Sequence, residues 1–227
     1  MYNIAVILAG GIGARVGGNM PKQLLPLADG KTILEHSVDA FEQAECIDEV
    51  CIVMHLDYIC EAEKMLEVND WQKVKHIVAG GKERWESSVN AIRLYQERLE
   101  FEQFADANIL LHDAARPFVS LRIINDVCKA LEEHEAVVVA IPSTDTVYEM
   151  QDGCVARIPN RSTIMRAQTP QAFRLSLIAG AYDIALNSGN MQVTDDCGVV
   201  FNHMPTQPIH IVLGEEQNKK ITFKEDI

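Results

Sequence analysis

The first residues that could do chemistry form a glycine-rich run, LAGGIGAR at positions 8–15, followed by PKQ at positions 21–23. Small residues let the backbone approach a ligand closely, and successive backbone N–H groups in such a turn form a concave site for an anion. Arg15 and Lys22 add positive charge. The pattern is neither a Walker A sequence nor a complete GxGxxG fingerprint, because Val16 occupies the place of the third glycine. We therefore expect a phosphate-binding turn, with a plain glycine turn and two solvated cations as the alternative.

A second group of residues, HDAARP at positions 112–117, follows an apolar run. An aspartate at the end of such a strand can bind a ribose hydroxyl or a metal ion. The guanidinium group of Arg116 can contact two oxygens of a phosphate at once. Alternatively, Asp113 is only a capping residue that forms an internal ion pair with the arginine. His112 is expected to be structural.

A third group, GGKERWESS at positions 80–88, joins two glycines to the serine-led start of a helical segment. Backbone and hydroxyl groups in this arrangement suit the recognition of a flat base. Ser87 could also be the N-cap of the helix, and the two roles are compatible.

Five further elements are weak predictors on their own. One of them, TDD at positions 194–196, would commonly be only a helix cap. The lysine pair in another, NKKIT at positions 218–222, would commonly be a solvated surface pair. The five elements are TDT at positions 144–146, NR at 160–161, AQTPQ at 167–171, TDD at 194–196 and NKKIT at 218–222.

These groups lie between segments whose patterns predict alternating strands and helices. Short apolar or β-branched runs alternate with helical periodicity, which predicts a mostly parallel sheet with right-handed crossovers. The strands are apolar along their whole length, as expected of a sheet that helices cover on both faces, and Ser120 is the expected N-cap of its helix. The expected strands are 3–8, 49–54, 76–78, 108–112, 136–141 and 208–213, and the expected helices are 32–44, 58–68, 87–99, 120–133 and 174–188.

The pattern changes late in the chain, where residues 146–150 and 154–158 flank a turn at Asp152 and Gly153. This is the pattern of a β-hairpin, and a hairpin inserted late in an α/β domain often projects from it. We therefore expect one three-layer α/β domain over residues 1–227, with a projecting hairpin arm at about residues 144–161. Ligands of open parallel sheets bind beyond the carboxyl ends of the strands, so the polar groups are expected to meet there.

The charge of the chain limits its partners. Twenty basic and 33 acidic residues give a net charge of −13, which repels a nucleic-acid backbone at long range. A phosphate must therefore bind in a locally positive pocket, with Mg²⁺ as the expected cofactor. No apolar run approaches the roughly 20 residues that span a bilayer, and the first residues lack the basic region of a signal peptide. We expect no membrane partner and a cytoplasmic location.

Cysteines and histidines give no sign of a metal centre. The six cysteines include no CxxC pair and are expected to be reduced and mostly buried. The seven histidines lack the spacing of metal ligands, which argues against a structural zinc site.

In combination and order, these elements resemble the 2-C-methyl-D-erythritol 4-phosphate cytidylyltransferase family and its relatives, the ribitol-5-phosphate cytidylyltransferases. The matching elements are AGGxGxR, PKQ, HDAARP, DT, R followed by AQTPQ, TDD and NxK[IV]T, and they cover essentially the whole chain. The resemblance implies a Rossmann-like nucleotidyltransferase fold and transfer of CMP from CTP to a polyol phosphate, with release of pyrophosphate. The attacking phosphate oxygen is already anionic and needs no general base, so catalysis should rest on positioning and charge stabilisation.

The resemblance also implies a role for each matching residue. Arg15, Lys22 and Lys220 are the expected catalytic residues, and Asp113 is the expected carboxylate near an Mg²⁺ ion that phosphates mainly hold. The expected nucleotide-binding residues are Ala9, Gly10, Gly11 and Gly13 for the triphosphate, Gly81, Lys82 and Ser87 for the cytosine, and Asp113 and Ala114 for the ribose. The expected polyol-phosphate residues are Arg116, Thr146, Arg161 and Thr194.

The family's hairpin arm crosses between protomers. The resemblance therefore implies a homodimer with residues 144–161 at its interface. Some polyol-phosphate residues of each site would then come from the partner subunit.

Two branches of the family leave the acceptor open. The start of the loop, Ala-Gly-Gly at positions 9–11, is more typical of the ribitol-5-phosphate branch, whereas HDAARP and RAQTPQAF resemble the isoprenoid branch. Lys82 replaces an acidic residue often seen in the base pocket, and Cys197 with Gly198 matches neither branch. We expect 2-C-methyl-D-erythritol 4-phosphate as the acceptor, in isoprenoid precursor synthesis, with D-ribitol 5-phosphate as the alternative.

Two other function classes compete with a CTP-dependent cytidylyltransferase. An NAD-dependent oxidoreductase also has glycines after its first strand, but it predicts an acidic residue at the end of the second strand. Positions 54–56 are Met-His-Leu, and PKQ has no place in that pattern. A non-catalytic sugar-nucleotide binding module would bind CTP without turnover. The cytidylyltransferase is therefore the leading hypothesis.

Overall fold

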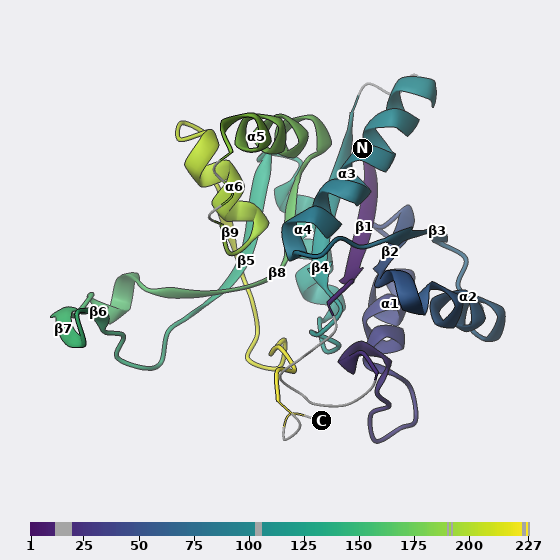
Figure 1. Cartoon of the computed structure of the whole chain (residues 1–227), viewed down its shortest axis with the longest axis horizontal. Coiled ribbons are helices and arrows are strands. Elements are labelled where there is room, and N and C mark those ends of the chain that lie inside the picture. Colours follow the sequence, from purple (N-terminus) through teal and green to yellow (C-terminus); the bar gives the residue numbers. More distant parts are fainter. Residues whose placement is uncertain (12–19, 103–105, 190, 192, 224–225, 227) are drawn as a thin grey trace.

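A seven-stranded sheet forms the centre of the computed structural model, which describes residues 1–11, 20–102, 106–189, 191, 193–223 and 226 (Figure 1). The strand order is β3-β2-β1-β4-β8-β5-β9. β8 runs antiparallel to its two neighbours and the other strands run parallel to one another. The strands are β1 (Tyr2–Ala9), β2 (Glu49–Met54), β3 (Val74–Ala79), β4 (Ala107–Asp113), β5 (Ala136–Pro142), β8 (Met165–Arg174) and β9 (His210–Leu213).

Helices cover both faces of this sheet, which confirms the expected three-layer α/β fold. Along β1, Ala5 and Ile7 pack into one buried cluster, and Ile4 and Val6 pack into the other. The uninterrupted apolar run of this strand is thereby explained, because neither face meets water. The helices of the first face are α1 (Ile33–Gln43), α2 (Ile59–Val68) and α4 (Leu121–Ala130), and those of the second are α3 (Arg84–Glu102), α5 (Leu175–Ser188) and α6 (Asp196–His203).

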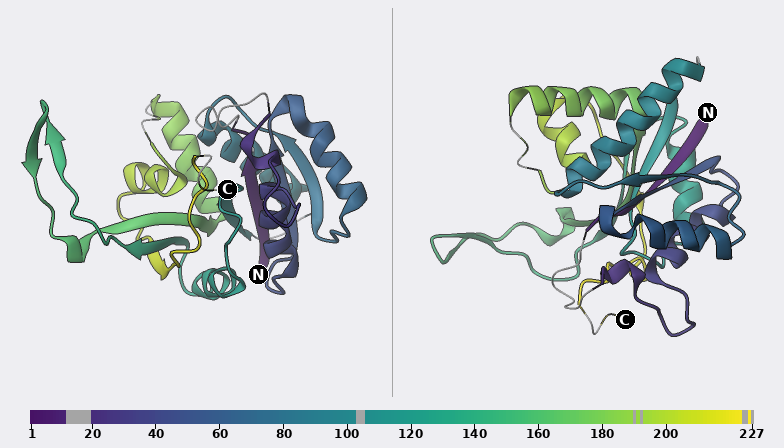
Figure 2. Two further views of the ribbon diagram at one scale, coloured as in Figure 1. Left: turned by 90° about the horizontal axis from the view of Figure 1, so that it is seen from below. Right: turned by 45° about the vertical axis from the view of Figure 1, so that its right-hand side comes forward.

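A two-stranded hairpin, β6 (Glu149–Gln151) and β7 (Cys154–Arg157), projects away from the sheet as expected (Figures 1 and 2). Asp152 and Gly153 form its turn with positive φ angles of 52° and 77°, a conformation that glycine adopts readily and aspartate tolerates. The paired strands are shorter than the expected ranges 146–150 and 154–158. Every residue of both strands is exposed.

The expected element list lacked β8, which lies between β4 and β5. The sequence of this strand contains Pro170, which has no N–H group to donate and therefore argues against a central strand. In the structure the pairing of β5 with β8 shifts register between Val138 and Ala140. Pro170 lies opposite that irregularity, so it interrupts no regular ladder of hydrogen bonds.

The start of α3 also differs from expectation. The helix begins at Arg84, so Ser87 lies within its first turn and the expected N-cap at Ser87 is wrong. α4 begins after Ser120, whose side chain accepts a hydrogen bond from the N–H of Ile123, and this expected N-cap is confirmed. The helix-cap interpretation of TDD is correct for Asp195, although the sequence analysis did not predict α6 after it.

The cysteines are free, as expected, but only half of them are buried. The buried ones are Cys51, Cys128 and Cys197. The expectation of mostly buried thiols is therefore wrong for Cys60 and Cys154, which are exposed.

A buried histidine joins β4 to β8. Nε2 of His112 lies 3.1 Å from the carbonyl oxygen of Arg116, and Nδ1 lies 3.0 Å from Oγ1 of Thr169. A carbonyl oxygen only accepts, so Nε2 carries the proton and Nδ1 accepts from the threonine hydroxyl. Oγ1 of Thr169 in turn accepts from the N–H of Asp113 at 3.1 Å. Burial lowers the pKa of His112 from 6.5 to about 4, so the neutral ring fixes the backbone on either side of Asp113.

We expect this histidine to make the protein sensitive to acid. Between pH 6.5 and about 4, the unfolded chain binds a proton at position 112 and the folded chain does not, so stability falls as the pH drops through that window. A full proton contributes about 1.4 kcal/mol per pH unit. His112→Gln should reduce that slope, measured as the free energy of unfolding in denaturant at several pH values.

The same change at His210, an exposed histidine, controls for the loss of an imidazole. Equal slopes in the wild type and His112→Gln would contradict the neutral state of the buried ring.

Candidate active site

A cavity of about 550 Å³ lies beyond the carboxyl ends of β1 and β4, beside the segment that follows β3. The fold therefore gathers the first three groups of the sequence analysis in one place. Ten of the expected site residues line this cavity, namely Ala9, Gly10, Gly11, Lys22, Gly81, Lys82, Ser87, Asp113, Ala114 and Lys220. Gly13 and Arg15 lie outside the described residues.

The glycine turn after β1 approaches the segment after β3 so closely that side chains are excluded. A Cβ atom on Gly10 would lie 2.9 Å from Oγ of Ser87 and 3.4 Å from Cα of Gly80. A Cβ atom on Gly80 would lie 3.1 Å from Cα of Gly10. Oγ of Ser87 accepts a hydrogen bond from the N–H of Gly81 at 3.1 Å, which ties the loop to α3. Gly80, which was not among the expected site residues, is thus needed for the close approach of the two segments.

Gln23 supports the glycine turn from inside the protein. Its side chain is only 3% exposed, and Nε2 donates hydrogen bonds to the carbonyl oxygens of Ala9 and of Gly11, the latter at 2.7 Å. Lys22 and Gln23 belong to one short 3-10 helix, Lys22–Leu24. This turn places the lysine at the cavity and the glutamine beneath it, which explains why the two residues are adjacent in the sequence.

Asp113, at the end of β4, is paired with two cations. Nζ of Lys220 lies 2.6 Å from Oδ2, and Nε of Arg84 lies 3.0 Å from Oδ1. Burial alone would raise the pKa of Asp113, but the charges of Arg84 and Lys220 hold it well below its usual range. The carboxylate is therefore ionised throughout the physiological pH range, and it can accept a hydrogen bond from a ribose hydroxyl.

The C-terminal segment carries Lys220 across the cavity. The N–H of Ile221, a fully buried residue, donates to the carbonyl oxygen of Ala115 at 2.8 Å, and the carbonyl oxygen of Ile221 accepts from Nζ of Lys22 at 2.6 Å. Asn218 is also fully buried, and its Nδ2 donates to the carbonyl oxygen of Thr169 at 2.9 Å. These bonds fix the segment on both sides of Lys220. No local feature of the sequence indicates this role of Asn218.

The four expected polyol-phosphate residues do not line this cavity. NH1 of Arg116 donates to the carbonyl oxygen of Asn218 at 2.8 Å, and its buried Nε has no hydrogen-bond partner among the described residues. Thr146 and Arg161 lie exposed on the arm, and Thr194 lies exposed just before α6. Within one chain, these four residues are therefore separate from the cavity.

The cavity is locally positive in a strongly acidic chain. Among the residues that the structure describes, four basic side chains line it, those of Lys22, Lys82, Arg84 and Lys220, against two acidic ones, those of Glu83 and Asp113. Ammonium and guanidinium groups beside a glycine turn stabilise phosphate oxygens and the charge that builds up during phosphoryl transfer. A serine, backbone groups and an ionised aspartate complete a site suited to a nucleoside triphosphate.

Comparisons with known proteins agree with this geometry. Residues 3–227 match the family model described as "IspD: 2-C-methyl-D-erythritol 4-phosphate cytidylyltransferase". The 2-C-methyl-D-erythritol 4-phosphate cytidylyltransferase of Thermobifida fusca (strain YX) is 44% identical over 98% of this chain and 89% of that protein. The crystal structure of 4-diphosphocytidyl-2C-methyl-D-erythritol synthase from Anaerococcus prevotii has a TM-score of 0.84 and 30% identity, over 99% of this chain and 92% of that chain.

A relative with a different name is also similar. The bifunctional ribulose 5-phosphate reductase/CDP-ribitol pyrophosphorylase of Haemophilus influenzae is 37% identical over 99% of this chain, which spans 46% of that protein. The match to the family model and the identity to the Thermobifida relative confirm the resemblance seen in the motifs. The chain therefore belongs to the 2-C-methyl-D-erythritol 4-phosphate cytidylyltransferase family.

Proposed function

We propose that this protein transfers CMP from CTP to 2-C-methyl-D-erythritol 4-phosphate. An oxygen of the acceptor phosphate forms a bond to the α-phosphorus of CTP, the bond from that phosphorus to the bridging oxygen breaks, and pyrophosphate leaves. The observation that carries the proposal is the meeting of Lys22, Lys220 and Asp113 around one cavity beside the glycine turn, in a chain of this family.

The two lysines hold the α-phosphate from opposite parts of the chain. Lys22 comes from the short helix after the glycine turn, and Lys220 comes from the C-terminal segment. Their positive charges offset the repulsion between two anionic substrates, which is the main barrier to this reaction. Arg15 belongs to the same proposal by its position in the motif.

The remaining residues that line the cavity contact the nucleotide. Backbone groups at positions 9–11 face the triphosphate, Gly81, Lys82 and Ser87 surround the cytosine, and Asp113 with Ala114 holds the ribose. Lys220 already pairs with Asp113 at 2.6 Å. The ammonium group has three N–H donors, so Lys220 can donate to phosphate oxygens in addition to Asp113.

Mg²⁺ is part of the proposal. Nowhere in the described part of the chain do three or more His, Cys, Asp or Glu side chains gather to hold a metal ion, and both oxygens of Asp113 already accept from cations. This donor set fits an ion that the substrate phosphates hold and that keeps several water ligands, with Asp113 as the nearest carboxylate. Bound in this way, Mg²⁺ would reduce the negative charge on the triphosphate.

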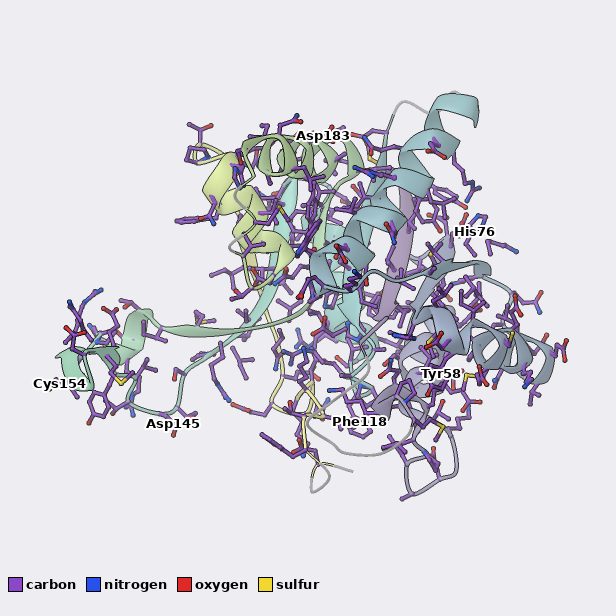
Figure 3. All side chains as sticks on the ribbon, in the orientation of Figure 1. Tyr58, His76, Phe118, Asp145, Cys154 and Asp183 are labelled. Atoms are coloured by element: carbon purple, nitrogen blue, oxygen red, sulfur yellow. The ribbon has the colours of Figure 1, made fainter. Side chains whose placement is uncertain are left out.

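The exposed apolar side chains of the arm support the proposal of a homodimer. These side chains have no core of their own to pack into, and they are Val147, Tyr148, Met150, Val155 and Ile158. Figure 3 shows Cys154 and Asp145 on the arm, well away from the sheet. Contact with a second copy would bury these side chains and would bring Thr146 and Arg161 of one copy toward the nucleotide pocket of the other.

A second acceptor, D-ribitol 5-phosphate, is favoured by the 37% identical CDP-ribitol pyrophosphorylase relative. Both acceptors are short polyol phosphates and differ in hydroxyl and methyl groups, which buried hydrogen-bonding partners discriminate strongly.

The cytoplasm stays the expected location, and no helix of the described ranges has the length and apolar character to cross a membrane.

The acceptor is tested by measuring pyrophosphate release with CTP and Mg²⁺. We expect turnover with 2-C-methyl-D-erythritol 4-phosphate, and a kcat/KM at least about 100-fold lower with D-ribitol 5-phosphate. The reverse order would assign the ribitol reaction to this chain. Binding of CTP without turnover on either acceptor would favour a non-catalytic module.

Lys220→Ala should lower kcat by about 100-fold or more, because one charged donor to the transition state is lost. The thermal midpoint should change little, since Arg84 still neutralises Asp113. Lys219→Ala is the matched control, because this neighbouring side chain is 56% exposed and lies 3.9 Å from Asp226. If Lys220→Ala turned over like Lys219→Ala, Lys220 would have no part in the reaction.

The dimer is tested by light scattering after size exclusion, where we expect about twice the chain mass of 25.3 kDa. Met150→Asp, at a residue 76% exposed on the arm, should shift the protein toward the monomer by placing a charge in an apolar contact. Val68→Asp, at an 83% exposed residue of α2, is the control. A monomeric wild type at micromolar concentration would refute the role of the arm.

A further inference from the structure

One arginine bridges two carboxylates that come from distant parts of the chain. Nε of Arg84 lies 3.0 Å from Oδ1 of Asp113 at the end of β4, and NH1 lies 2.7 Å from Oδ2 of Asp196 at the start of α6. The planar guanidinium group holds both carboxylates in fixed directions, whereas an ammonium group is a compact charge whose three donors rotate freely. Arg84 thus connects the nucleotide cavity to the helix that follows Thr194.

Apart from these two contacts, the position of Arg84 at the start of a helix is unfavourable for a cation. Arg84 is the first residue of α3, and a cation in the first turn opposes the helix dipole. Burial alone would lower the pKa of Arg84, but the charges of Asp196 and Asp113 raise it above its usual value. The two carboxylates therefore account for an arginine at this position, and helix stability does not.

Asp196 is held firmly on its other side. The side chain is fully buried, and its Oδ1 accepts a hydrogen bond from the hydroxyl of Tyr182 at 2.6 Å. The neighbouring Asp195 caps α6 by accepting from the N–H of Gly198 at 2.8 Å, and it also accepts from Nε2 of Gln171 at 2.7 Å. The backbone next to Thr194 is therefore fixed, through Asp196, to the same guanidinium group as Asp113.

We propose that Arg84 is a positioning residue that couples the binding of the nucleotide to the binding of the polyol phosphate, through Asp113 on one side and Asp196 on the other. This inference rests on the proposed function, in which Asp113 holds the ribose and Thr194 contacts the acceptor. A ribose hydroxyl that donates to Asp113 restricts this carboxylate further and, through the shared guanidinium group, also restricts Asp196 and the start of α6. Acceptor affinity rises as a result, and by linkage the acceptor raises nucleotide affinity by the same factor.

The coupling is measured with a CTP analogue in which carbon replaces the oxygen between the α- and β-phosphorus, so that no reaction occurs. Binding of 2-C-methyl-D-erythritol 4-phosphate is followed by calorimetry with Mg²⁺, in the absence and presence of the analogue. In the wild type we expect the analogue to tighten acceptor binding by about tenfold. In Asp196→Asn the ratio should fall to near one, because a neutral amide no longer holds the guanidinium group.

Glu49→Gln is a closely matched control. Glu49 is also a buried carboxylate, and its Oε1 accepts from Arg98 at 2.7 Å and from Tyr95 at 2.8 Å, but it lies at the opposite end of the sheet, at the start of β2. Both variants should lower the thermal midpoint, whereas only Asp196→Asn should lose the coupling. If Asp196→Asn does not fold, Arg84→Lys takes its place, because an ammonium group lacks the rigid planar fork that spans the two carboxylates.

Two results would overturn the inference, namely a ratio near one in the wild type or an unchanged ratio in both Asp196→Asn and Arg84→Lys. Failure of the proposed function has a different signature, which is a wild type that releases no pyrophosphate from CTP with this acceptor. Turnover in the wild type combined with an unchanged ratio in the variants would therefore reject the role of Arg84 alone.

Discussion

The charge on Asp113 is the interaction on which the site depends. An ionised carboxylate that is 8% exposed needs nearby positive charge, and Arg84 and Lys220 supply it from two segments more than a hundred residues apart in the sequence. The same contacts place an arginine at the start of α3 and draw the C-terminal segment across the cavity. Neutralising one buried carboxylate thus determines where two other parts of the chain lie.

Around this charge, neutral side chains hold the backbone segments of the site in position. His112 joins Thr169 to Arg116, and Gln23 holds the carbonyl groups of Ala9 and Gly11. A cationic site needs such a frame, because catalysis by charge stabilisation works only when the donors are already in position before the substrates meet. The acidic surface has little influence at this range, since salt screens exposed charges beyond about 8 Å while buried pairs are screened much less.

The sequence indicated the residues that line the cavity better than the residues that hold them in place. The glycine run after the first strand, PKQ, GGKERWESS, HDAARP and NKKIT are local signals, and ten of the residues drawn from them line one cavity. Asn218 and Asp196 were not assigned, because each acts through a contact with a segment distant in sequence. Gln23 was not assigned, because its contacts are with backbone carbonyl groups, which carry no sequence signal. The sheet was predictable where strands were uniformly apolar, whereas Pro170 concealed β8, and the polar start of α6 suggested only a cap.

The single reversed strand has a consequence for the evolution of this architecture. β8 enters the sheet directly from the arm, and its first residues lie at the same edge as the carboxyl ends of the parallel strands. The arm and the frame of the pocket are therefore one continuous piece of chain. Any exchange of the hairpin between two homologues therefore places its junction immediately before a central strand of the sheet.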